Sequence, residues 1–337
     1  MCTRVLWNDN DLAVLSGRTM DWPESTDPVL TVLPQGLERD GGELGGQTVI
    51  AENPLTWTSR LGSLVTTVYG AGTVDGLNER GLAAHMLYLD ITELAPRDPG
   101  RPGLHMGLWV QYLLDNAATV EEALALLDTF QLVMIEMNGF AATVHVALED
   151  ARGDSAIIEH IAGEQVVHHD RAYTVMTNAP AYDEQRSLLE EQVRKARELG
   201  YDKAASDVPL PGNVNPVDRF QRAAYFRALL PKPENERQAV AAVLAITRNA
   251  SVPFGAPYAS GRFAVYNTEY RTVCDLTNQR YFFELSTSPN LLWTELGAFD
   301  LSPGAPVMTL DPDDIHLSGN VSDTYTQAPD PFAPAGR

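Results

Sequence analysis

The first residues of the chain, 1-MCTRVLWNDNDLAVLSGRTMDW-22, place a cysteine directly after the initiator methionine. If Met1 is removed, Cys2 carries both a free α-amine and a thiol. An α-amine titrates near ~8 and a free thiol near ~8.5, so both groups can change protonation around neutral pH. A nucleophile and a base on one residue are the minimum requirement for catalysis by an N-terminal nucleophile.

The residues after Cys2 predict a β-hairpin. Residues 5–7 and 12–15 are rich in strand formers, and the Asn-Asp-Asn-Asp run between them tolerates turn conformations. A tight turn at the centre of this run would set Cys2 opposite Gly17 or Arg18. Asp21 would follow on the same returning strand.

Arg18 and Asp21 could therefore complete a site around Cys2. A guanidinium near a thiol favours the thiolate, and a carboxylate can hold and orient an ammonium group. The alternative interpretation is a frayed chain terminus beside a solvated Arg–Asp pair. Spacing alone does not separate the two interpretations.

Composition narrows the range of functions. The 337-residue chain has a net charge of −21, which disfavours nucleic acid and anionic membrane surfaces as partners. Its two cysteines, Cys2 and Cys274, exclude a disulfide framework and cannot hold a metal cluster by themselves. The longest apolar run, 239–246, is too short to span a membrane, and no signal peptide is recognisable. We therefore expect a cytoplasmic protein, or a periplasmic or secreted one if Met1 replaces a removed leader peptide.

The order of the expected elements predicts an α+β fold in which sheets lie between helix layers. Strands are expected before residue 70 and over 82–89, and the segments 70–73 and 75–81 have the composition of turns. Two helices follow, and then four short strands between 143 and 176. Further helices are expected over 185–199, 217–230 and 236–248, and the last strands over 263–266, 270–276 and 281–286.

The same pattern predicts one large domain. Residues 1–311 contain all of these elements without an obvious linker. Residues 312–337 are rich in Pro, Asp and Ser, and we expect them to form an edge arm or a disordered tail.

Two residues far from the terminus are further candidates. Asn178 ends an apolar strand, where its carboxamide could donate to an oxyanion, although it could also simply cap the turn before Pro180. Arg219 lies one turn into a helix that also carries Arg222 and Arg227, so a solvated helix face is the alternative.

Other catalytic signatures are weak or absent. The sequence contains neither a Gly-x-Ser-x-Gly elbow nor a His-Glu-x-x-His pair. A thiol-protease arrangement would need His85 or His145 next to Cys2, and the sequence does not orient either histidine. It remains a minor alternative.

Several longer stretches carry a resemblance to a known family. They are MCTR, GRTMDW, NPLTWTSRLGS at 53–63, DGLNERGLAAHMLYL at 75–89, GDSAIIEHIAGEQVVHHDRAYTVMTNAPAYDEQ at 153–185, PGNVNPVDRFQRA, RNASVPFG and RTVCDLTNQRYFFE. In these stretches, which run through nearly the whole chain, the sequence resembles the choloylglycine hydrolase family. That family contains bile salt hydrolases and penicillin V acylases.

The resemblance implies a fold and a set of site residues. The fold is the four-layer αββα sandwich of N-terminal nucleophile hydrolases, and members are commonly homotetramers without a cofactor or metal. The nucleophile corresponds to Cys2, and the backbone N–H that completes the oxyanion hole falls at Tyr88. The remaining catalytic positions correspond to Arg18, Asp21, Asn178 and Arg219.

The resemblance also bears on the substrate, a small-molecule amide with an apolar acyl group. Tyrosine at position 88 is typical of penicillin V acylases, whereas classical Gram-positive bile salt hydrolases have asparagine there. The residues in these motifs are most similar to those of an acylase-rich branch from Gram-negative bacteria. Several members of that branch also deacylate N-acyl homoserine lactones. Bile salt hydrolysis is the alternative activity, and a non-catalytic ligand-binding protein is the alternative of another class. The residues expected to line the acyl pocket are Trp22, Met134 and Phe140.

Overall fold

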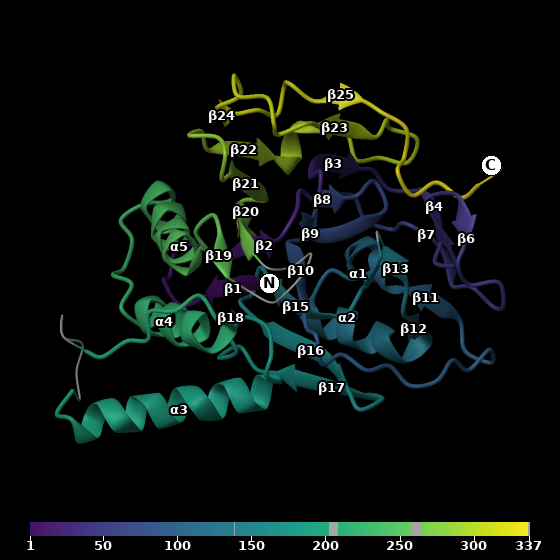
Figure 1. Ribbon diagram of the computed structural model, residues 1–337. Helices are drawn as coiled ribbons and strands as arrows, with labels where there is room; N and C mark the ends of the chain where they lie inside the picture. Colours follow the sequence, from purple (N-terminus) through teal and green to yellow (C-terminus); the bar gives the residue numbers. More distant parts are fainter. Residues whose placement is uncertain (138, 202–207, 258–264, 336–337) are drawn as a thin grey trace.

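The computed structural model describes residues 1–137, 139–201, 208–257 and 265–335 (Figure 1). The side chains of Met137 and Phe140 also lie outside the described part, so the predicted pocket role of Phe140 has no structural counterpart here.

Two large sheets form the centre of the molecule. The first has eight strands, ordered β18 (Val175–Met176), β1 (Cys2–Trp7), β2 (Leu15–Trp22), β20 (Val265–Asp275), β21 (Arg280–Leu285), β22 (Leu292–Glu295) and β24 (Gly319–Asn320), with β19 (Ala256–Pro257) paired to β20. The second has nine strands, ordered β17 (Glu164–His169), β16 (Ser155–Ile161), β15 (Val144–Asp150), β10 (Leu82–Tyr88), β9 (Gly72–Asn78), β8 (Ser63–Val68), β3 (Val29–Leu33), β23 (Met308–Leu310) and β25 (Thr326–Gln327).

Four short ladders complete the described strands. They pair β11 (Gly103–His105) with β12 (Gln131–Val133), β13 (Glu136–Met137) with β14 (Phe140–Ala141), β4 (Glu38–Asp40) with β7 (Thr56–Thr58), and β5 (Glu43–Leu44) with β6 (Gln47–Thr48).

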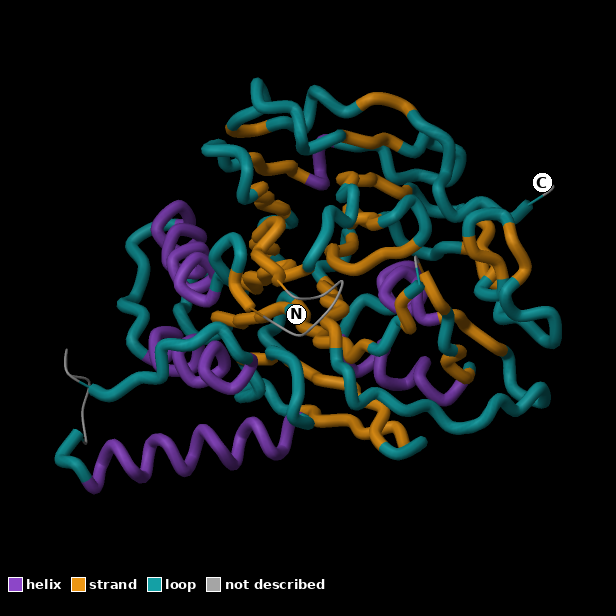
Figure 2. Tube along the Cα trace, in the orientation of Figure 1, coloured by secondary structure: helices purple, strands orange, loops and turns teal. Residues whose placement is uncertain are grey.

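Helices cover the outer faces of the two sheets. The first sheet is covered by α4 (Pro216–Ala228) and α5 (Glu236–Ala250), with α3 (Tyr182–Glu198) packed on α4. The second is covered by α1 (Trp109–Asn116) and α2 (Val120–Leu126). Figure 2 shows these two groups of helices on either side of the strands. The predicted four-layer αββα arrangement is confirmed.

Alternation along β10 shows how the layers are built. Ala83 and Leu87 belong to the core between the two sheets, whereas Leu82, Ala84 and Met86 belong to the core beneath α1. This is the period of two that a strand buried on both faces requires. Because β10 also contacts β1 and β2, it brings an interior strand of the second sheet against the start of the chain.

The opening hairpin forms, but its register differs from the prediction. Cys2 pairs with Met20, and Trp7 pairs with Leu15 across a seven-residue loop, 8–14. The Asn10 side chain holds this loop: its Oδ1 accepts the N–H groups of Leu12 and Ala13, both at 2.9 Å, and its Nδ2 donates to the Ala13 carbonyl at 2.8 Å. The prediction of a two-residue turn was wrong because this side chain closes a wider loop.

The segment 75–81 was also predicted incorrectly, because residues up to Asn78 form part of β9 rather than a turn. A Cβ on Gly76 would lie 2.6 Å from the Leu64 carbonyl oxygen, so glycine is needed for the close approach of β8. The buried Asp75 carboxylate accepts hydrogen bonds from Thr272 at 2.5 Å and Tyr281 at 2.7 Å. These long-range partners explain an acidic residue within a core strand.

The helix starts follow their capping residues. Thr119, Asn215 and Asn235 accept hydrogen bonds from backbone N–H groups in the first turns of α2, α4 and α5. Pro216 occupies the first turn of α4. The site residue Arg219 is thereby held in that same turn.

The residues beyond Asp311 add a strand to each of the two sheets. β24 joins the edge of the first sheet and β25 joins the edge of the second. Val321 and Tyr325, which lie between these strands in the sequence, are buried.

None of the described helices combines the length and the apolar character needed to cross a membrane.

Candidate active site

Cys2 begins β1 at the centre of the molecule, where Figure 1 marks the N-terminus. Its side chain is buried, with Sγ 3.6 Å from Arg18 Nη2 and 3.8 Å from Met20 Sδ. Met20 is the cross-strand partner, and Arg18, two residues earlier, points to the same face. Arg18 thus contacts the sulfur even though the register differs from the prediction.

The Arg18 guanidinium is fixed in a buried position. Nη2 donates to the Met86 carbonyl at 2.8 Å, and Nη1 lies 3.4 Å from the Tyr270 hydroxyl. Burial by itself would lower the pKa of Arg18, but the neighbouring Tyr270, Cys2 and Asp75 raise it above its ordinary value. A permanent positive charge therefore lies beside the Cys2 sulfur.

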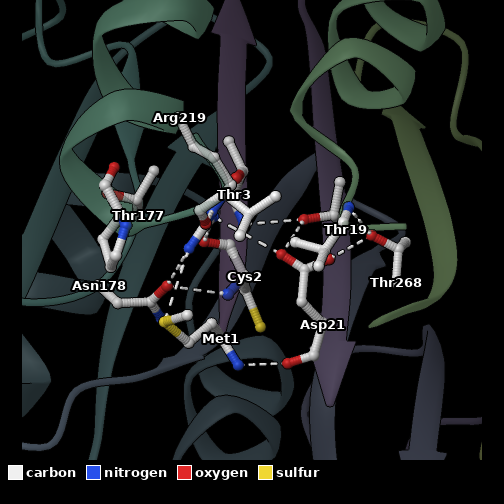
Figure 3. A network of polar contacts seen from close by, with 12 residues as sticks. Met1, Cys2, Thr3, Thr19, Asp21, Thr177, Asn178, Arg219 and Thr268 are labelled. Atoms are coloured by element: carbon white, nitrogen blue, oxygen red, sulfur yellow. Dashed lines mark hydrogen bonds and ion pairs between the residues drawn. The ribbon is translucent and has the colours of Figure 1, made fainter. Parts of the chain in front are cut away.

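Asp21 lies on the other face of β2, and its backbone bonds the first residue of the chain (Figure 3). Its N–H donates to the Met1 carbonyl at 2.7 Å, and its carbonyl accepts from the Met1 amine. Its carboxylate accepts from Thr268 at 2.6 Å and Thr19 at 3.1 Å, and lies 3.6 Å from Arg219 Nη1.

Asn178 reaches the terminus from the opposite side (Figure 3). Its Oδ1 accepts from the Cys2 N–H at 3.0 Å and from Arg219 Nη2 at 2.7 Å, and its Nδ2 donates to the Tyr88 carbonyl at 2.5 Å. The side chain thus bonds the start of the first sheet and the end of β10, and does more than cap a turn.

Arg219 is fully buried and does not lie on a solvated helix face. Nη1 donates to the Cys2 carbonyl at 2.7 Å and to Thr3 Oγ1 at 2.5 Å. Nε donates to the Val214 carbonyl at 2.8 Å. Through these bonds, the guanidinium connects α4 to β1 and to the Asn178 carboxamide.

Tyr88 contributes its backbone. In an extended strand, the N–H and carbonyl of one residue point to the same side. The Tyr88 carbonyl accepts from Asn178, and the Met86 carbonyl on the same strand edge accepts from Arg18. Because the ladder between β9 and β10 ends at His85, the Tyr88 N–H faces this edge beyond the ladder.

Met1 is still attached to the site and buried. Its side chain packs in a cluster with Val252, Ala256 and Tyr266, and burial lowers the pKa of its amine. While Met1 is present, the Cys2 nitrogen is an amide N–H that donates to Asn178. Loss of Met1 would turn this nitrogen into an amine.

An apolar pocket opens beside the Cys2 thiol, with a cavity volume of about 110 Å³. Three aromatic residues form part of its wall: the Trp22 indole N–H donates to the Tyr69 hydroxyl at 2.9 Å, and the Trp22 and Tyr88 rings meet edge to face at 5.6 Å. Other lining residues include Met86, Leu87, Ala141, Ala142 and Val144.

The pocket contains only part of the predicted lining. Trp22 lines it, whereas Met134 packs against the core beneath α1 and is not among the described lining residues. Sequence reasoning missed Tyr69, whose backbone adopts φ +55° as it leaves β8 and enters a glycine-rich turn. A large aromatic residue directly before Gly70-Ala71-Gly72 was the available signal.

The two histidines considered as partners of Cys2 are engaged elsewhere. His85 lies between Asp75 and Glu149, with Nε2 2.6 Å from Glu149 Oε1. Burial alone would lower the pKa of His85, but Glu149 and Asp75 raise it to about 9. His145 binds Glu159 and the Thr177 carbonyl. The thiol-protease arrangement therefore has no geometric support in the described part of the chain.

One group of potential metal ligands occurs among the described residues, formed by Asp75, His85 and Cys274. The Asp75 carboxylate is already bonded to His85, Thr272 and Tyr281. Burial raises the pKa of the Cys274 thiol well above its usual range, which keeps it protonated. This donor set is committed to internal hydrogen bonds and does not fit a metal.

Comparison with known proteins gives consistent relatives. The family described as linear amide C–N hydrolases, choloylglycine hydrolase family, matches residues 2–317. Penicillin V acylase of Pectobacterium atrosepticum is 37% identical, over 99% of this chain and 90% of its own. Bile salt hydrolase/transferase of Bifidobacterium longum subsp. longum is 26% identical, over 70% of this chain and 77% of its own.

Solved structures agree with the fold. The structure of penicillin V acylase from Agrobacterium tumefaciens superposes with a TM-score of 0.85 at 37% identity, and the match covers all of both chains. A mutant conjugated bile acid hydrolase from Clostridium perfringens superposes with a TM-score of 0.77 at 20% identity, over 95% of this chain and 98% of its own. The second similarity concerns the fold alone.

Proposed function

Because this chain belongs to the choloylglycine hydrolase family of linear amide C–N hydrolases, we propose that it uses Cys2 to cleave substrates of the penicillin V acylase type. The observation that carries the proposal is the position of the Cys2 thiol. It lies beside an aromatic, apolar pocket, with the Arg18 guanidinium 3.6 Å from the sulfur. An apolar acyl group in that pocket would bring its amide carbonyl to the thiol.

The proposed reaction starts once Met1 has left. The thiolate attacks the amide carbonyl, and the Cys2 α-amine takes the thiol proton and delivers it to the departing amine. Collapse of the tetrahedral adduct breaks the C–N bond and leaves a thioester on Cys2. Water, deprotonated by the same amine, then hydrolyses the thioester and releases the acid.

The oxyanion of the tetrahedral adduct needs donors placed in advance. We assign this role to the Tyr88 N–H and the Asn178 carboxamide, which are joined by the 2.5 Å bond between Asn178 Nδ2 and the Tyr88 carbonyl. The second hydrogen on Nδ2 is left for the substrate. Both groups border the edge of β10 nearest Cys2.

Three charged residues lie around the start of the chain. Arg219 donates to the Cys2 carbonyl at 2.7 Å, which fixes the first peptide group of the mature chain. Asp21 lies on the other side, where its carboxylate is bonded to Thr19 and Thr268 and lies 3.6 Å from Arg219 Nη1. Arg18 favours the thiolate by its charge. Each residue thus has a distinct role around one nucleophile.

The pocket supports a single aromatic ring as the preferred acyl group. Its volume of about 110 Å³ is comparable with an apolar cavity of ~150 Å³ that binds benzene. A phenoxyacetyl group, as in penicillin V, fits this description better than a steroid does. The alkyl chain of an N-acyl homoserine lactone is the second candidate, because the wall is almost wholly apolar.

A substrate panel tests this order. Penicillin V, glycine- and taurine-conjugated bile salts, and acyl homoserine lactones of several chain lengths would be compared by kcat/KM. We expect penicillin V to give the highest value. A clear preference for a conjugated bile salt would refute the proposed specificity while leaving the amide hydrolase assignment intact.

Intact-mass measurement tests the role of the terminus and the alternative of a non-catalytic binding protein. The proposal requires that active enzyme begins at Cys2. A binding protein would retain Met1, which blocks the amine, and would release no product from any member of the panel.

Assembly and location complete the proposal. We expect a homotetramer that takes a small-molecule substrate and binds neither nucleic acid nor membrane, which light scattering and vesicle or DNA binding assays can check. Cell fractionation of the natural host would distinguish the expected cytoplasmic location from a periplasmic or secreted one.

A further inference from the structure

We infer that His145, held by Glu159, positions the Asn178 carboxamide through the carbonyl of Thr177. The inference rests on the proposed role of Asn178 in the oxyanion hole. It assigns to His145 the part of a positioning residue, because among the described residues its ring bonds Glu159 and Thr177 rather than Cys2 or the wall of the apolar pocket.

The contacts form a short chain from the second sheet to the site. On β15, His145 is buried, with Nε2 3.0 Å from the Thr177 carbonyl oxygen and Nδ1 3.2 Å from Glu159 Oε1. Glu159 lies on the neighbouring strand β16 and is equally buried. Thr177 directly precedes Asn178.

The His145 ring lies between a backbone carbonyl and a carboxylate. A backbone carbonyl can only accept a hydrogen bond, so Nε2 must carry a hydrogen. Glu159 also accepts the Tyr182 N–H at 3.0 Å and lies 3.4 Å from His168 Nε2. Burial alone would raise the pKa of Glu159, but the hydrogen bonds from His145 and His168 lower it to about 2. The Glu159 carboxylate thus holds the His145 ring from the side opposite the Thr177 carbonyl.

Asn178 needs this support because its strand is very short. The ladder of β18 with β1 pairs Val175 with Val5 and Met176 with Arg4, so it ends before Thr177. Side-chain hydrogen bonds hold the two residues after the ladder. Thr177 Oγ1 donates to the Pro216 carbonyl at 3.1 Å, and Gln185 Nε2 donates to the Asn178 carbonyl at 3.0 Å.

His145 provides the link from the second sheet in this set of bonds. Gln185 belongs to α3 and Pro216 to α4, so the segment 177–178 is held from two helices and one strand. The Tyr88 N–H, the other proposed oxyanion donor, lies at the end of β10, which pairs with β15. His145 therefore fixes Asn178 to the strand next to the one that carries its partner donor. Oxyanion catalysis requires this relative position to be accurate, and a misplacement of ~1 Å can cost about 10²-fold in rate.

A double-mutant cycle tests the inference. Asn178→Ala, His145→Leu and the double variant would be assayed on penicillin V after intact mass has shown loss of Met1 in each. We expect Asn178→Ala to lower kcat by ~10²–10³-fold. We expect His145→Leu to lower kcat by ~10-fold or more, with KM changed less than about twofold, because it moves a transition-state donor. The double variant should be no slower than Asn178→Ala, since His145 acts only through Asn178.

Two further variants separate positioning from folding. Glu159→Gln keeps the shape of the side chain while removing its charge, so it should lower kcat in the same direction as His145→Leu and also lose its effect when Asn178 is alanine. His160→Leu replaces the next residue on β16, a buried histidine whose ring packs on Trp109, and is the matched control. It should lower the melting temperature without changing kcat.

The outcomes separate the positioning role of His145 from the oxyanion role of Asn178. The inference is supported if the rate loss caused by His145→Leu or by Glu159→Gln disappears when Asn178 is already alanine. Wild-type kcat in both of those variants, or rate losses that simply add to that of Asn178→Ala, would overturn it. Full activity of Asn178→Ala itself would instead refute the proposed oxyanion role.

Discussion

At Cys2, the sulfur and the backbone nitrogen face different partners. The sulfur lies beside the Arg18 guanidinium and Met20, and the nitrogen lies beside the Asn178 carboxamide. Charge that favours a thiolate is thus separated from the acceptor that would orient an amine. One residue can then act as nucleophile and as proton carrier without the two functions competing for one partner.

Replacement of the Cys2 thiol tests its role directly. Cys2→Ala removes the nucleophile, and we expect kcat to fall by more than ~10³-fold with an unchanged melting temperature. Cys2→Ser should be nearly as inactive, because a hydroxyl is a far weaker nucleophile than a thiolate. Steady-state kinetics and thermal unfolding provide both readouts. Substantial turnover by Cys2→Ala would exclude the proposed mechanism.

Trp22 separates the apolar pocket from a second cavity. It lines both, and the second also contains Glu24, Asp27 and Glu269. We expect Trp22→Ala to lower kcat/KM for penicillin V by about 10-fold, because the loss of an aromatic contact and its area costs on the order of 1.4 kcal/mol. The variant should lose less activity on longer acyl chains, since the two cavities would join. Trp22→Phe keeps a ring there and is the control; equal losses on short and long acyl groups would contradict this account.

At the scale of elements, the β1–β2 loop sets the position of Cys2 relative to Arg18. Asn10→Ala removes the buried side chain that bonds Leu12 and Ala13 in the loop 8–14. We expect a loss of about 1–3 kcal/mol in the free energy of unfolding, measured by urea titration. Activity per folded molecule should fall as well, because the register of the hairpin becomes less restricted.

Asp11→Asn is the matched control in the same loop. Asp11 pairs with Lys232 at 2.5 Å, but both side chains are largely exposed. Exposed pairs of this kind contribute little. The account of the hairpin would be contradicted if Asn10→Ala unfolded at the same urea concentration as Asp11→Asn.

Local pattern predicted those elements that local chemistry determines. The three helices with Thr or Asn caps could be located from their first turns, and Arg18 near Cys2 is a consequence of the alternation of a strand. β18 could not be assigned to its sheet in this way. Four short strands were expected between 143 and 176, but their pattern does not indicate that the last of them, Val175–Met176, pairs with β1 in the first sheet.

The distant site residues could be predicted only from resemblance. Asn178 contacts Cys2 across 176 positions of sequence, and Arg219 does so across 217. Periodicity carries no information at such separations. Val144 in the pocket wall was missed for the same reason, because its role depends on how the two sheets pack.

At the scale of the whole molecule, a buried charged network holds the sheets together. Arg4 on β1 bonds Glu149 on β15 with Nη2 to Oε2 at 2.5 Å, and Glu149 bonds His85 on β10, which in turn bonds Asp75 on β9. Burial alone would raise the pKa of Glu149, but Arg4 and His85 lower it to about 2. The cation His85 thus lies between two carboxylates in the interior.

This network predicts how stability depends on pH. The pKa of His85 is raised from 6.5 to about 9, so its contribution is complete below pH 6.5 and is lost as pH rises through 9. The pKa of Glu149 is lowered from 4.5 to about 2, so its contribution is complete above pH 4.5 and is lost as pH falls through 2. Urea unfolding at a series of pH values should therefore show greatest stability between pH 4.5 and 6.5 from these two groups.

In His85→Gln, the free energy of unfolding should be lower at pH 6. Most of its decline between pH 6.5 and 9 should be absent. His85 contributes on the order of 3 kcal/mol to the free energy of unfolding, which is the shift of its pKa at ~1.36 kcal/mol per pKa unit. An alkaline limb that is as steep in the variant as in the natural sequence would show that another group is responsible.

The central claim is that a Cys2 exposed by loss of Met1 forms the acyl intermediate. The most direct measurement is mass spectrometry of the N-terminal peptide after turnover of penicillin V is quenched in acid. We expect a peptide that begins at Cys2, with the phenoxyacetyl group attached as a thioester. A fully active enzyme whose N-terminal peptide still begins with Met1, or whose acyl group is found on another residue, would contradict the account.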